Sequence, residues 1–253
     1  MIFGDYHVHS KFSKDGKSTI EENVQVALKK GLKQIASTEH AFCHPYGIKK
    51  KHLKLIREEI NQVNQKYPVR VLFGLEANLI SSKGEIDVPL DVQNQLDMLV
   101  LGFHKGCRLL SKKPFISFFK HFGLFGTSKK RVEKNTQAYI NAIKNNNVNI
   151  LAHLNCGCKV NVAEVGKVAK ENNVYIELNG KQNRLTRDEI KTLVDLKCMF
   201  IVDSDAHSAD RVADCHRGMN IIEKNNIPTE LVANINKLPV FVKRISKLKE
   251  SGE

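Results

Sequence analysis

The stretch Val69-Arg70-Val71-Leu72-Phe73-Gly74-Leu75-Glu76 is a mostly apolar run that ends on a carboxylate. Residues 98–101, 148–152 and 199–202 form further apolar runs, and each is followed within a few residues by histidine or aspartate. Short apolar runs of this kind are typical of strands buried on both faces in a parallel sheet. Ionisable side chains are costly to bury unless they are paired or bind a metal ion. The pattern therefore predicts a functional site at one end of such a sheet.

Helical patterns alternate with the predicted strands along the chain. The first strand surrounds Asp5-Tyr6-His7-Val8-His9, and the others are expected at residues 34–37, 69–75, 98–103, 148–152, 174–178 and 199–202. Amphipathic helices are expected at residues 19–31, 52–67, 131–145, 163–172 and 187–196. Seven strands that alternate with helices predict an α/β fold in which one parallel sheet closes as a barrel.

An open, doubly wound sheet is the alternative fold. Such a sheet binds its ligand in one crevice, often beside a glycine-rich phosphate turn, and the sequence contains no GxGxxG or Walker motif. Polar residues follow every predicted strand, as expected for a barrel with its site at the carboxyl ends of the strands. We therefore predict a single barrel domain over residues 1–253, with an irregular insertion at 105–130 and a helical tail at 229–253.

The predicted insertion at residues 105–130 mixes five phenylalanines with many lysines. Because it follows a strand that ends in a candidate site residue, one interpretation is a lid that closes over substrate. The other interpretation is a short amphipathic helix that packs its rings on the barrel.

Composition and length limit the class of protein. A chain of 253 residues with 42% hydrophobic residues is long enough for one sizeable core. No stretch approaches the roughly 20 apolar residues that span a membrane, and the first residues lack the features of a signal peptide. We expect a cytoplasmic protein without membrane association. Six scattered cysteines do not resemble a disulfide scaffold; Cys156 and Cys158 lie beside the predicted site or are reduced thiols packed around a loop.

The chain is strongly basic, with a formal net charge of +13. Such a charge favours anionic partners, which include phosphate compounds and nucleic acid. However, 31 of the 40 basic residues are lysine, whereas phosphate sites more often use arginine, whose fork matches the oxygens. The charge is compatible with a phosphate substrate and also with a general drift in composition.

Six of the ten histidines follow predicted strands, and two acidic residues occupy matching places. These eight residues are His7, His9, His40, Glu76, His104, His153, Asp205 and His207. Side chains alternate along a strand, so the His-x-His and Asp-x-His pairs each direct two groups to one side. A single histidine at a strand end is usually a hydrogen-bonded structural residue. Eight such groups at one end predict ligands for two or three divalent cations, with Glu76 as a bridge.

The groups that carry these residues resemble a known family. They are Asp5-Tyr6-His7-Val8-His9-Ser10, Ser37-Thr38-Glu39-His40, Gly74-Leu75-Glu76, Gly102-Phe103-His104, Ala152-His153-Leu154 and Ser204-Asp205-Ala206-His207. They are similar to the motifs of the polymerase-and-histidinol-phosphatase (PHP) family of metal-dependent phosphoesterases, over nearly the whole chain. The opening motif is most similar to the histidinol-phosphatase-like branch. The resemblance implies a distorted TIM-like (β/α)7 barrel and a trinuclear site for zinc, manganese or iron.

The resemblance also implies that the same eight residues are metal ligands. The family's remaining ligand lies in the loop after the first strand and is His or Asp; here Asp15 takes its place. The dipeptide Asp15-Gly16 is equally suited to an ordinary turn. Asp5 is expected to orient a ligand histidine. Asn179 is either a substrate contact or a polar cap on the barrel rim.

A metal site of this kind predicts hydrolysis of a phosphate monoester of a small soluble metabolite by a metal-activated hydroxide. Asp205 and His207 are the candidates for protonating the leaving group. Basic residues near the strand ends are the candidates for holding the phosphate, with Arg211 first. They are Lys105, Arg108, Lys159, Lys181, Arg184 and Arg211.

Other functions remain compatible with the sequence. A nucleic-acid phosphodiesterase or exonuclease fits the charge, although no recognised nucleic-acid-binding motif is present. A noncatalytic scaffold stabilised by metals is disfavoured by the full set of ligands. Metal-dependent amide hydrolysis is disfavoured by Glu76 and by the lack of a bridging lysine. The sequence leaves the substrate and the oligomeric state open.

Overall fold

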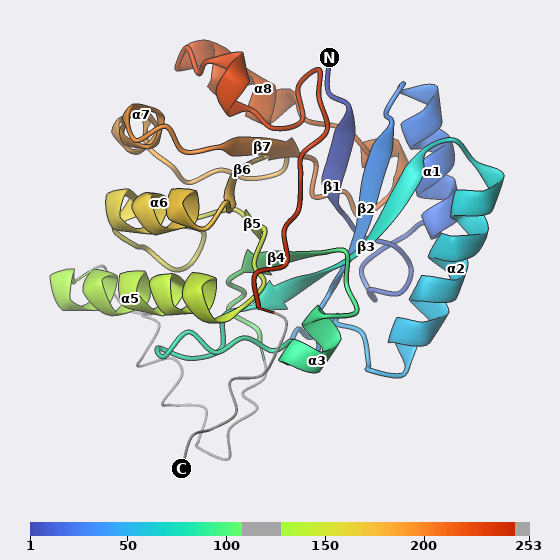
Figure 1. The fold of residues 1–253 in the computed structure, drawn as a ribbon, viewed down its shortest axis with the longest axis horizontal. Coiled ribbons are helices and arrows are strands. Elements are labelled where there is room, and N and C mark those ends of the chain that lie inside the picture. Colours follow the sequence, from blue (N-terminus) through green and yellow to red (C-terminus); the bar gives the residue numbers. More distant parts are fainter. Residues whose placement is uncertain (108–127, 246–253) are drawn as a thin grey trace.

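The protein is described by a computed structural model over residues 1–107 and 128–245. Seven parallel strands form one sheet in the order β1-β2-β3-β4-β5-β6-β7, which curls into a nearly closed barrel (Figure 1). The strands are β1 (Gly4–Val8), β2 (Gln34–His40), β3 (Arg70–Asn78), β4 (Met98–Gly102), β5 (Ile150–Leu151), β6 (Tyr175–Asn179) and β7 (Phe200–Asp203). The predicted fold class, a distorted TIM-like (β/α)7 barrel in one domain, is confirmed.

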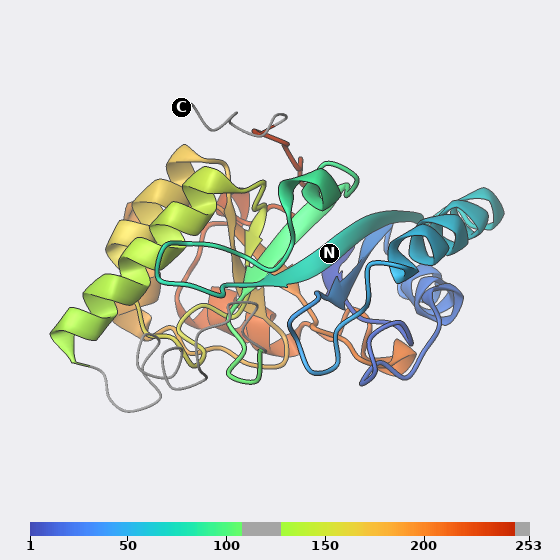
Figure 2. The same ribbon diagram turned by 90° about the horizontal axis from the view of Figure 1, so that it is seen from below.

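Helices cover the outside of the sheet, with α1 and α2 on one side and α5 and α6 on the other (Figure 2). The helices are α1 (Ile20–Lys29), α2 (His52–Lys66), α3 (Leu90–Gln93), α5 (Lys129–Asn145), α6 (Val162–Glu171), α7 (Arg187–Asp195) and α8 (His216–Lys224). Capping boxes begin two of them, Thr19 with Glu22 at α1 and Thr186 with Glu189 at α7. Each pair satisfies amide groups that the first helical turn leaves without partners.

Two apolar clusters hold these layers together. The larger one lies between the strands and the surrounding helices. The smaller one consists of Tyr6, Ala36, Leu72, Met98, Val100, Ile150, Ala152 and Ile201, which come from six of the seven strands or their ends and fill the inside of the barrel. A packed interior leaves the carboxyl ends of the strands as the place for a site.

The barrel closes between β1 and β7 through side chains rather than through a regular ladder. Only one bridge, Val8 to Ala206, joins these two edges. The side-chain amide of Asn234 donates to Gly4 O at 2.8 Å and to Val202 O at 2.6 Å. Asp203 Oδ1 accepts from the backbone N–H of Tyr6 at 2.7 Å. We refer to this junction as the β1–β7 seam.

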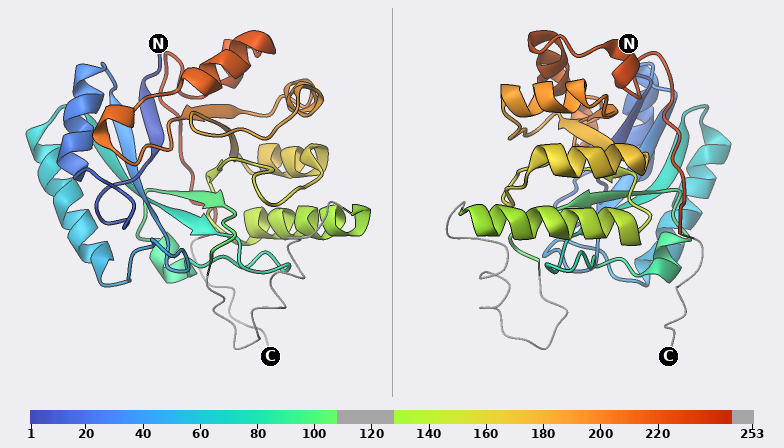
Figure 3. Two further views of the ribbon diagram at one scale, coloured as in Figure 1. Left: turned by 180° about the vertical axis from the view of Figure 1, so that it is seen from behind. Right: turned by 60° about the vertical axis from the view of Figure 1, so that its left-hand side comes forward.

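The segment after α8 crosses the amino ends of the strands (Figures 1 and 3). The ring of Phe241 lies edge-on to Tyr6 and to Tyr175, with centroids 5.1 and 5.9 Å away. Arg244 donates to the carbonyl groups of Ile143, Asn146, Val148 and Asn172. This segment, residues 236–245, is called the closing tail below.

The prediction of a helical tail over residues 229–253 is wrong for the residues that are described. Only Thr229–Leu231 forms a single 3-10 turn, and residues 236–245 form neither helix nor strand. Asn147 Oδ1 accepts from the backbone N–H groups of both Arg244 and Ile245, at 2.9 and 2.8 Å. These long-range bonds take the place of the local bonds that a helix needs, and Pro239 lacks a donor for such a helix.

Other elements differ from the prediction at their ends. The strand predicted at 148–152 is confined to Ile150–Leu151, and β2 continues three residues beyond the predicted end to His40. Helices α3 and α8 were not expected. Within the predicted insertion, residues 105–107 form a turn and α5 begins at Lys129, whereas residues 108–127, with the phenylalanines and Arg108, lie outside the described residues.

Candidate metal centre

The nine residues predicted as metal ligands come together at the carboxyl end of the barrel. Glu76, near the end of β3, lies at the centre and contacts five imidazoles. Its Oε1 atom is 3.0 Å from His153 Nε2, 3.3 Å from His104 Nε2 and 3.4 Å from His7 Nε2. Its Oε2 atom is 2.7 Å from His40 Nδ1 and 3.7 Å from His9 Nε2. A carboxylate with donors on both oxygens has the arrangement of a bridging ligand.

Two further carboxylates complete the cluster. Asp205 Oδ1 lies 3.6 Å from His9 Nε2 and 3.5 Å from His207 Nδ1. Asp15 Oδ2 lies 3.3 Å from His40 Nε2 and 3.4 Å from His207 Nε2. The loop after β1 thus places Asp15 beside two of the histidines.

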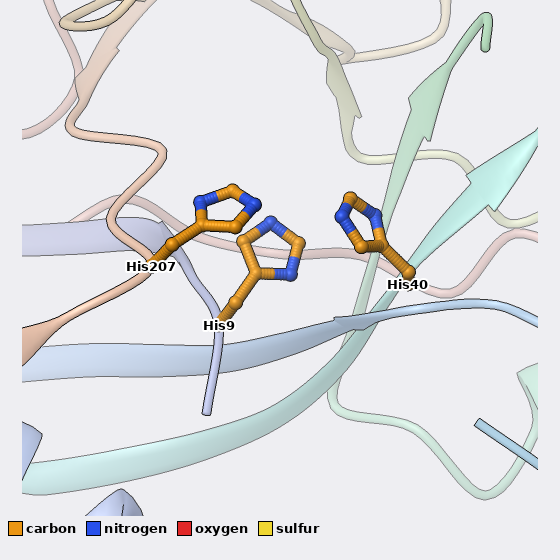
Figure 4. Close-up of side chains that lie close together, drawn as sticks. All are labelled: His9, His40 and His207. Carbon is orange, nitrogen blue, oxygen red and sulfur yellow. The ribbon is translucent and has the colours of Figure 1, made fainter. Parts of the chain in front are cut away.

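Three histidines from distant parts of the sequence meet around the β1–β7 seam (Figure 4). The ring of His9 lies between those of His40 and His207, with centroids 4.2 and 4.3 Å away. One nitrogen atom from each of these three rings lies within 4.8 Å of the other two. A second such group contains His7, His9 and Glu76, and a third contains Glu76, His104 and His153.

Hydrogen bonds outside the cluster fix the direction of three rings. His7 Nδ1 is 2.6 Å from Glu177 Oε1, His104 Nδ1 is 2.7 Å from Asn78 Oδ1, and His207 Nδ1 is 3.0 Å from the carbonyl of Asp205. Because each partner is an acceptor, Nδ1 carries the hydrogen in the neutral form of each ring, and Nε2 then directs its lone pair to the cluster. This is the second-layer arrangement that is found around metal-binding histidines.

Several buried polar atoms in the cluster make no well-aligned hydrogen bond to any group within residues 1–107 and 128–245, although two of them, His40 Nδ1 and Glu76 Oε2, lie 2.7 Å apart. They are His7 Nε2, both ring nitrogens of His9, Asp15 Oδ1, His40 Nδ1, Glu76 Oε2 and His153 Nδ1. Native structures leave few buried polar groups without partners, and seven in one cluster call for a ligand. Imidazole nitrogen and carboxylate oxygen are ligands for zinc and other divalent transition metals. The residues present therefore fit divalent metal ions.

The charges of the cluster control its pKa values. Burial alone would lower the pKa of His7, but the carboxylates of Glu177 and Glu76 outweigh it and raise that pKa. Burial likewise opposes the effect of Glu76 and Asp15 on His40, whose pKa rises to about 9. Burial would raise the pKa of Asp205, whereas the adjacent His7 and His9 hold it well below its usual range.

The backbone around the cluster leaves little space for larger side chains and adopts unusual φ angles at two residues. A Cβ atom at Gly102 would lie 3.0 Å from both Glu76 Oε1 and His153 Cε1, so a larger residue would press on the site. His153 and Asp205 adopt positive φ angles of 32° and 55°. Such angles are costly for non-glycine residues and are often retained at functional sites.

Glu39 organises the loop that carries Asp15. Its buried carboxylate accepts hydrogen bonds from the backbone and hydroxyl groups of Ser10 and Ser13, at 2.6 to 3.1 Å. It also accepts from Ser37 Oγ at 2.7 Å. Five donors on one carboxylate fold the loop back over the strand ends. The sequence motif contained Glu39 but did not reveal this function.

Glu177, rather than Asp5, contacts a predicted ligand ring. Glu177 Oε2 also accepts from the backbone N–H of His153 at 2.6 Å. Asp5 instead accepts from Ser204 Oγ at 2.5 Å and from the backbone N–H groups of Ser204 and Ala213. Asp5 also accepts from the backbone N–H of His7 at 3.5 Å. It therefore contacts the backbone of one predicted ligand and holds the loop after β7, and its expected influence on a histidine ring stays a prediction.

The residues proposed to hold phosphate lie in different surroundings. Asn179 is fully buried and donates to Glu177 at 2.9 Å and to Asp205 at 3.3 Å, while its oxygen accepts from two backbone N–H groups. Lys181 Nζ lies 3.8 Å from Asp205 Oδ1. Arg211 pairs with Asp214 at 2.5 Å and lines a surface hollow of about 440 Å³ with Gly180, Arg217 and Lys224. Lys105 packs over Gly157. Arg108 lies outside the described residues.

One histidine beside the cluster was not expected from the sequence. His44, in the loop after β2, stacks on His40 with centroids 3.9 Å apart and lies edge-on to His104 at 4.7 Å. Burial and the neighbouring His40 lower its pKa to about 4. No strand-end motif contains His44, and only the path of the loop brings it to the site.

Comparison with known proteins agrees with this geometry. The PHP domain family matches residues 5–181. The chain belongs to the PHP domain family.

None of the helices within residues 1–107 and 128–245 combines the length and apolar character that crossing a bilayer requires.

Several known proteins match this chain over most of the length of both. A probable phosphatase of Clostridium botulinum is 30% identical, and the match covers 97% of this chain and 96% of the relative. A probable phosphatase of Caldanaerobacter subterraneus is also 30% identical, with 98% and 94% covered. The histidinol phosphate phosphatase of Lactococcus lactis, solved with zinc, L-histidinol and phosphate, has a similar fold: TM-score 0.58, 19% identity, 89% and 94% covered.

Proposed function

We propose that this chain, a metal-dependent phosphatase of the PHP family, hydrolyses the phosphate monoester of a small soluble metabolite. The observation that carries the proposal is the cluster around Glu76, in which buried nitrogen and oxygen atoms converge without partners within the protein. Similarity to the probable phosphatases and the fold shared with a histidinol phosphate phosphatase support the same class of reaction.

The predicted ligands fall into three sets by proximity. The first contains His7, His9 and Asp205, the second His104 and His153, and the third Asp15, His40 and His207. Glu76 lies between the sets and would be shared. Divalent ions held there would lower the pKa of water and clamp phosphoryl oxygens for in-line attack. The proposed metals are zinc, manganese or iron, with two or three ions per chain.

The protein supplies orientation and charge to this reaction. Glu177 fixes the ring of His7, and Asn78 fixes that of His104, so the inward nitrogens are positioned before substrate arrives. The lowered pKa of Asp205 keeps its carboxylate ionised at neutral pH. Asp205 and His207 are the two candidates for protonating the leaving group, and His207, at 19% exposed, is more open to solvent than Asp205, at 5%.

Two basic residues at the carboxyl end of the barrel are proposed to bind the substrate. Lys181 lies next to Asp205, and Lys105 lies on the turn after β4 beside the loop of His153. Asn179 positions Glu177 and Asp205 and has no free amide hydrogen for a substrate. Arg211 would have to leave Asp214 to contact phosphate at this cluster.

Metal analysis combined with a panel of substrates tests the proposal. The wild-type protein and His7→Ala, each reconstituted with manganese or zinc, are compared on phosphate monoesters, including L-histidinol phosphate, and on single-stranded DNA. We expect two or three ions per chain and monoester turnover in the wild type, and loss of both in His7→Ala. Fewer than two ions per chain, or release of nucleotides without monoester turnover, would overturn it.

A further inference from the structure

His44 lies at the edge of the predicted metal cluster but differs from the predicted ligands in its hydrogen bonding. The backbone N–H of Tyr46 points at its Nδ1 atom from 3.3 Å. Nδ1 is therefore an acceptor, and the hydrogen of the neutral ring lies on Nε2. In His7, His104 and His207 the roles of the two nitrogens are reversed, since Nδ1 faces an oxygen acceptor and therefore donates. Those rings present a lone pair at Nε2, and His44 presents an N–H group.

The position of the His44 ring is fixed by its loop. The backbone N–H of His44 bonds to Ala41 O at 3.3 Å, and Gly47 N–H bonds to His44 O at 2.9 Å. A Cβ atom at Gly47 would lie 1.9 Å from Ala41 O, so this tight turn requires glycine. Together with the stacking on His40, the turn holds the imidazole next to the cluster.

The second nitrogen of His44, Nε2, has no hydrogen-bond acceptor among the described residues, 1–107 and 128–245. The ring is half-buried, whereas the rings of His7, His9, His40 and His153 are buried. A nitrogen of His44 lies within 4.8 Å of nitrogens of both His40 and His104. An anion bound by ions at those two residues would therefore lie beside the His44 ring, whose N–H group is at Nε2.

We propose that His44 binds the substrate, by donating a hydrogen bond from Nε2 to a phosphoryl oxygen, and that it is not a metal ligand. The inference rests on the proposed function and assigns one residue of its phosphate subsite. A hydrogen bond from this N–H group to a charged phosphoryl oxygen is stronger than one between two neutral groups.

Two substitutions separate substrate binding from metal binding. His44→Phe keeps the stacked ring and removes the donor, whereas His44→Gln places an amide N–H near the position of Nε2. His216→Gln, at a histidine that is 93% exposed on α8, serves as the matched control. For each manganese-loaded protein, we would measure bound metal, the Kd of inorganic phosphate by calorimetry, and kcat and KM for 4-nitrophenyl phosphate.

We expect His44→Phe to raise the Kd of phosphate and the KM by about 10-fold or more, with metal content unchanged and kcat less affected. His44→Gln should recover part of this loss, and His216→Gln should match the wild type. Loss of an ion in His44→Phe, or unchanged phosphate affinity, would overturn the inference. If the wild type binds phosphate but hydrolyses no monoester, the proposed function fails, and the phosphate Kd still decides the role of His44.

Discussion

The two ends of the barrel meet their hydrogen-bonding needs in opposite ways. At the amino end, the closing tail covers the strands, and Arg244 alone satisfies four carbonyl groups. At the carboxyl end, buried nitrogens and oxygens around Glu76 lack partners. At the amino end the chain thus supplies its own hydrogen-bond partners, whereas the polar atoms at the carboxyl end gain partners only when a ligand binds. This contrast separates stability from function along the same seven strands.

Among the substitutions considered, removal of the Glu76 carboxylate should have the largest effect, and this effect should fall on the carboxyl end of the barrel. Glu76→Gln removes the charge that is shared by five imidazoles, so we expect at least one metal ion to be lost and phosphatase activity to fall by roughly 1000-fold or more. Metal analysis and kcat/KM for a monoester measure the change. Glu59→Gln, at a carboxyl on α2 that accepts from Ile20 N–H, is the matched control and should retain both. Full activity in Glu76→Gln would reject the site.

The metal-free protein should lose stability as pH rises. The pKa of His40 is raised to about 9, and that of His7 is raised as well. A raised pKa stabilises the fold below the unfolded value of about 6.5, and this contribution disappears as pH rises through the folded pKa. We expect a decrease on the order of 3 kcal/mol between about pH 6.5 and 9.

Urea unfolding across this range, with EDTA or with manganese, tests the pH dependence. Bound ions would replace protons on the same nitrogen atoms, so the decrease should be smaller in the metal-loaded protein. His40→Asn should flatten the dependence of the metal-free form. Equal stability of the metal-free wild type at both ends of the range would contradict the assignment of charge in the cluster.

Substitution of Glu177 should weaken the carboxyl end without removing any predicted ligand. Glu177→Gln replaces the acceptor beside His7 Nδ1 by an amide, and loss of such second-layer partners costs about 10- to 100-fold in metal affinity or activity. Competition with a metal-binding dye measures the affinity. Glu189→Gln, at the capping box of α7, is the control and should alter stability but not metal affinity. Unchanged affinity in Glu177→Gln would show that His7 needs no orienting partner.

At the amino end, the effect should be confined to stability. Arg244→Met leaves the carbonyl groups that end α5 and α6 without their charged donor, and we expect the free energy of unfolding to fall by about 1.5 kcal/mol. Metal content and kcat should remain at wild-type values. Urea unfolding and metal analysis of the same preparation measure both quantities. A loss of metal in this variant would mean that the two ends are coupled.

The sequence revealed most of the site because its chemistry repeats at strand ends. His7, His9, Glu76 and Asp205 follow or end apolar runs, so their convergence could be inferred from strand direction alone. Seven strands and their order followed from the same alternation. The residue types therefore predicted both the barrel and the kind of site.

The surroundings of the site depend on contacts that no local pattern contains. Glu177 reaches His7 across 170 positions of sequence, and its strand resembles any other buried strand. His44 comes to the cluster only through a turn after β2. The lysine-rich composition of residues 229–253 suggested a helix, but Asn147, almost 100 positions earlier in the sequence, binds the backbone of the closing tail.

The β1–β7 seam has a consequence for the biosynthesis of the protein. His7 and His9 leave the ribosome almost 200 or more residues before Asp205, His207 and Asn234, the last of which fastens the seam. A nascent chain holds only part of the cluster until its last strand docks beside the first. Full metal capacity would then be acquired only after Asn234 has left the ribosome, and a chain terminated before β7 would lack the affinity of one that contains it.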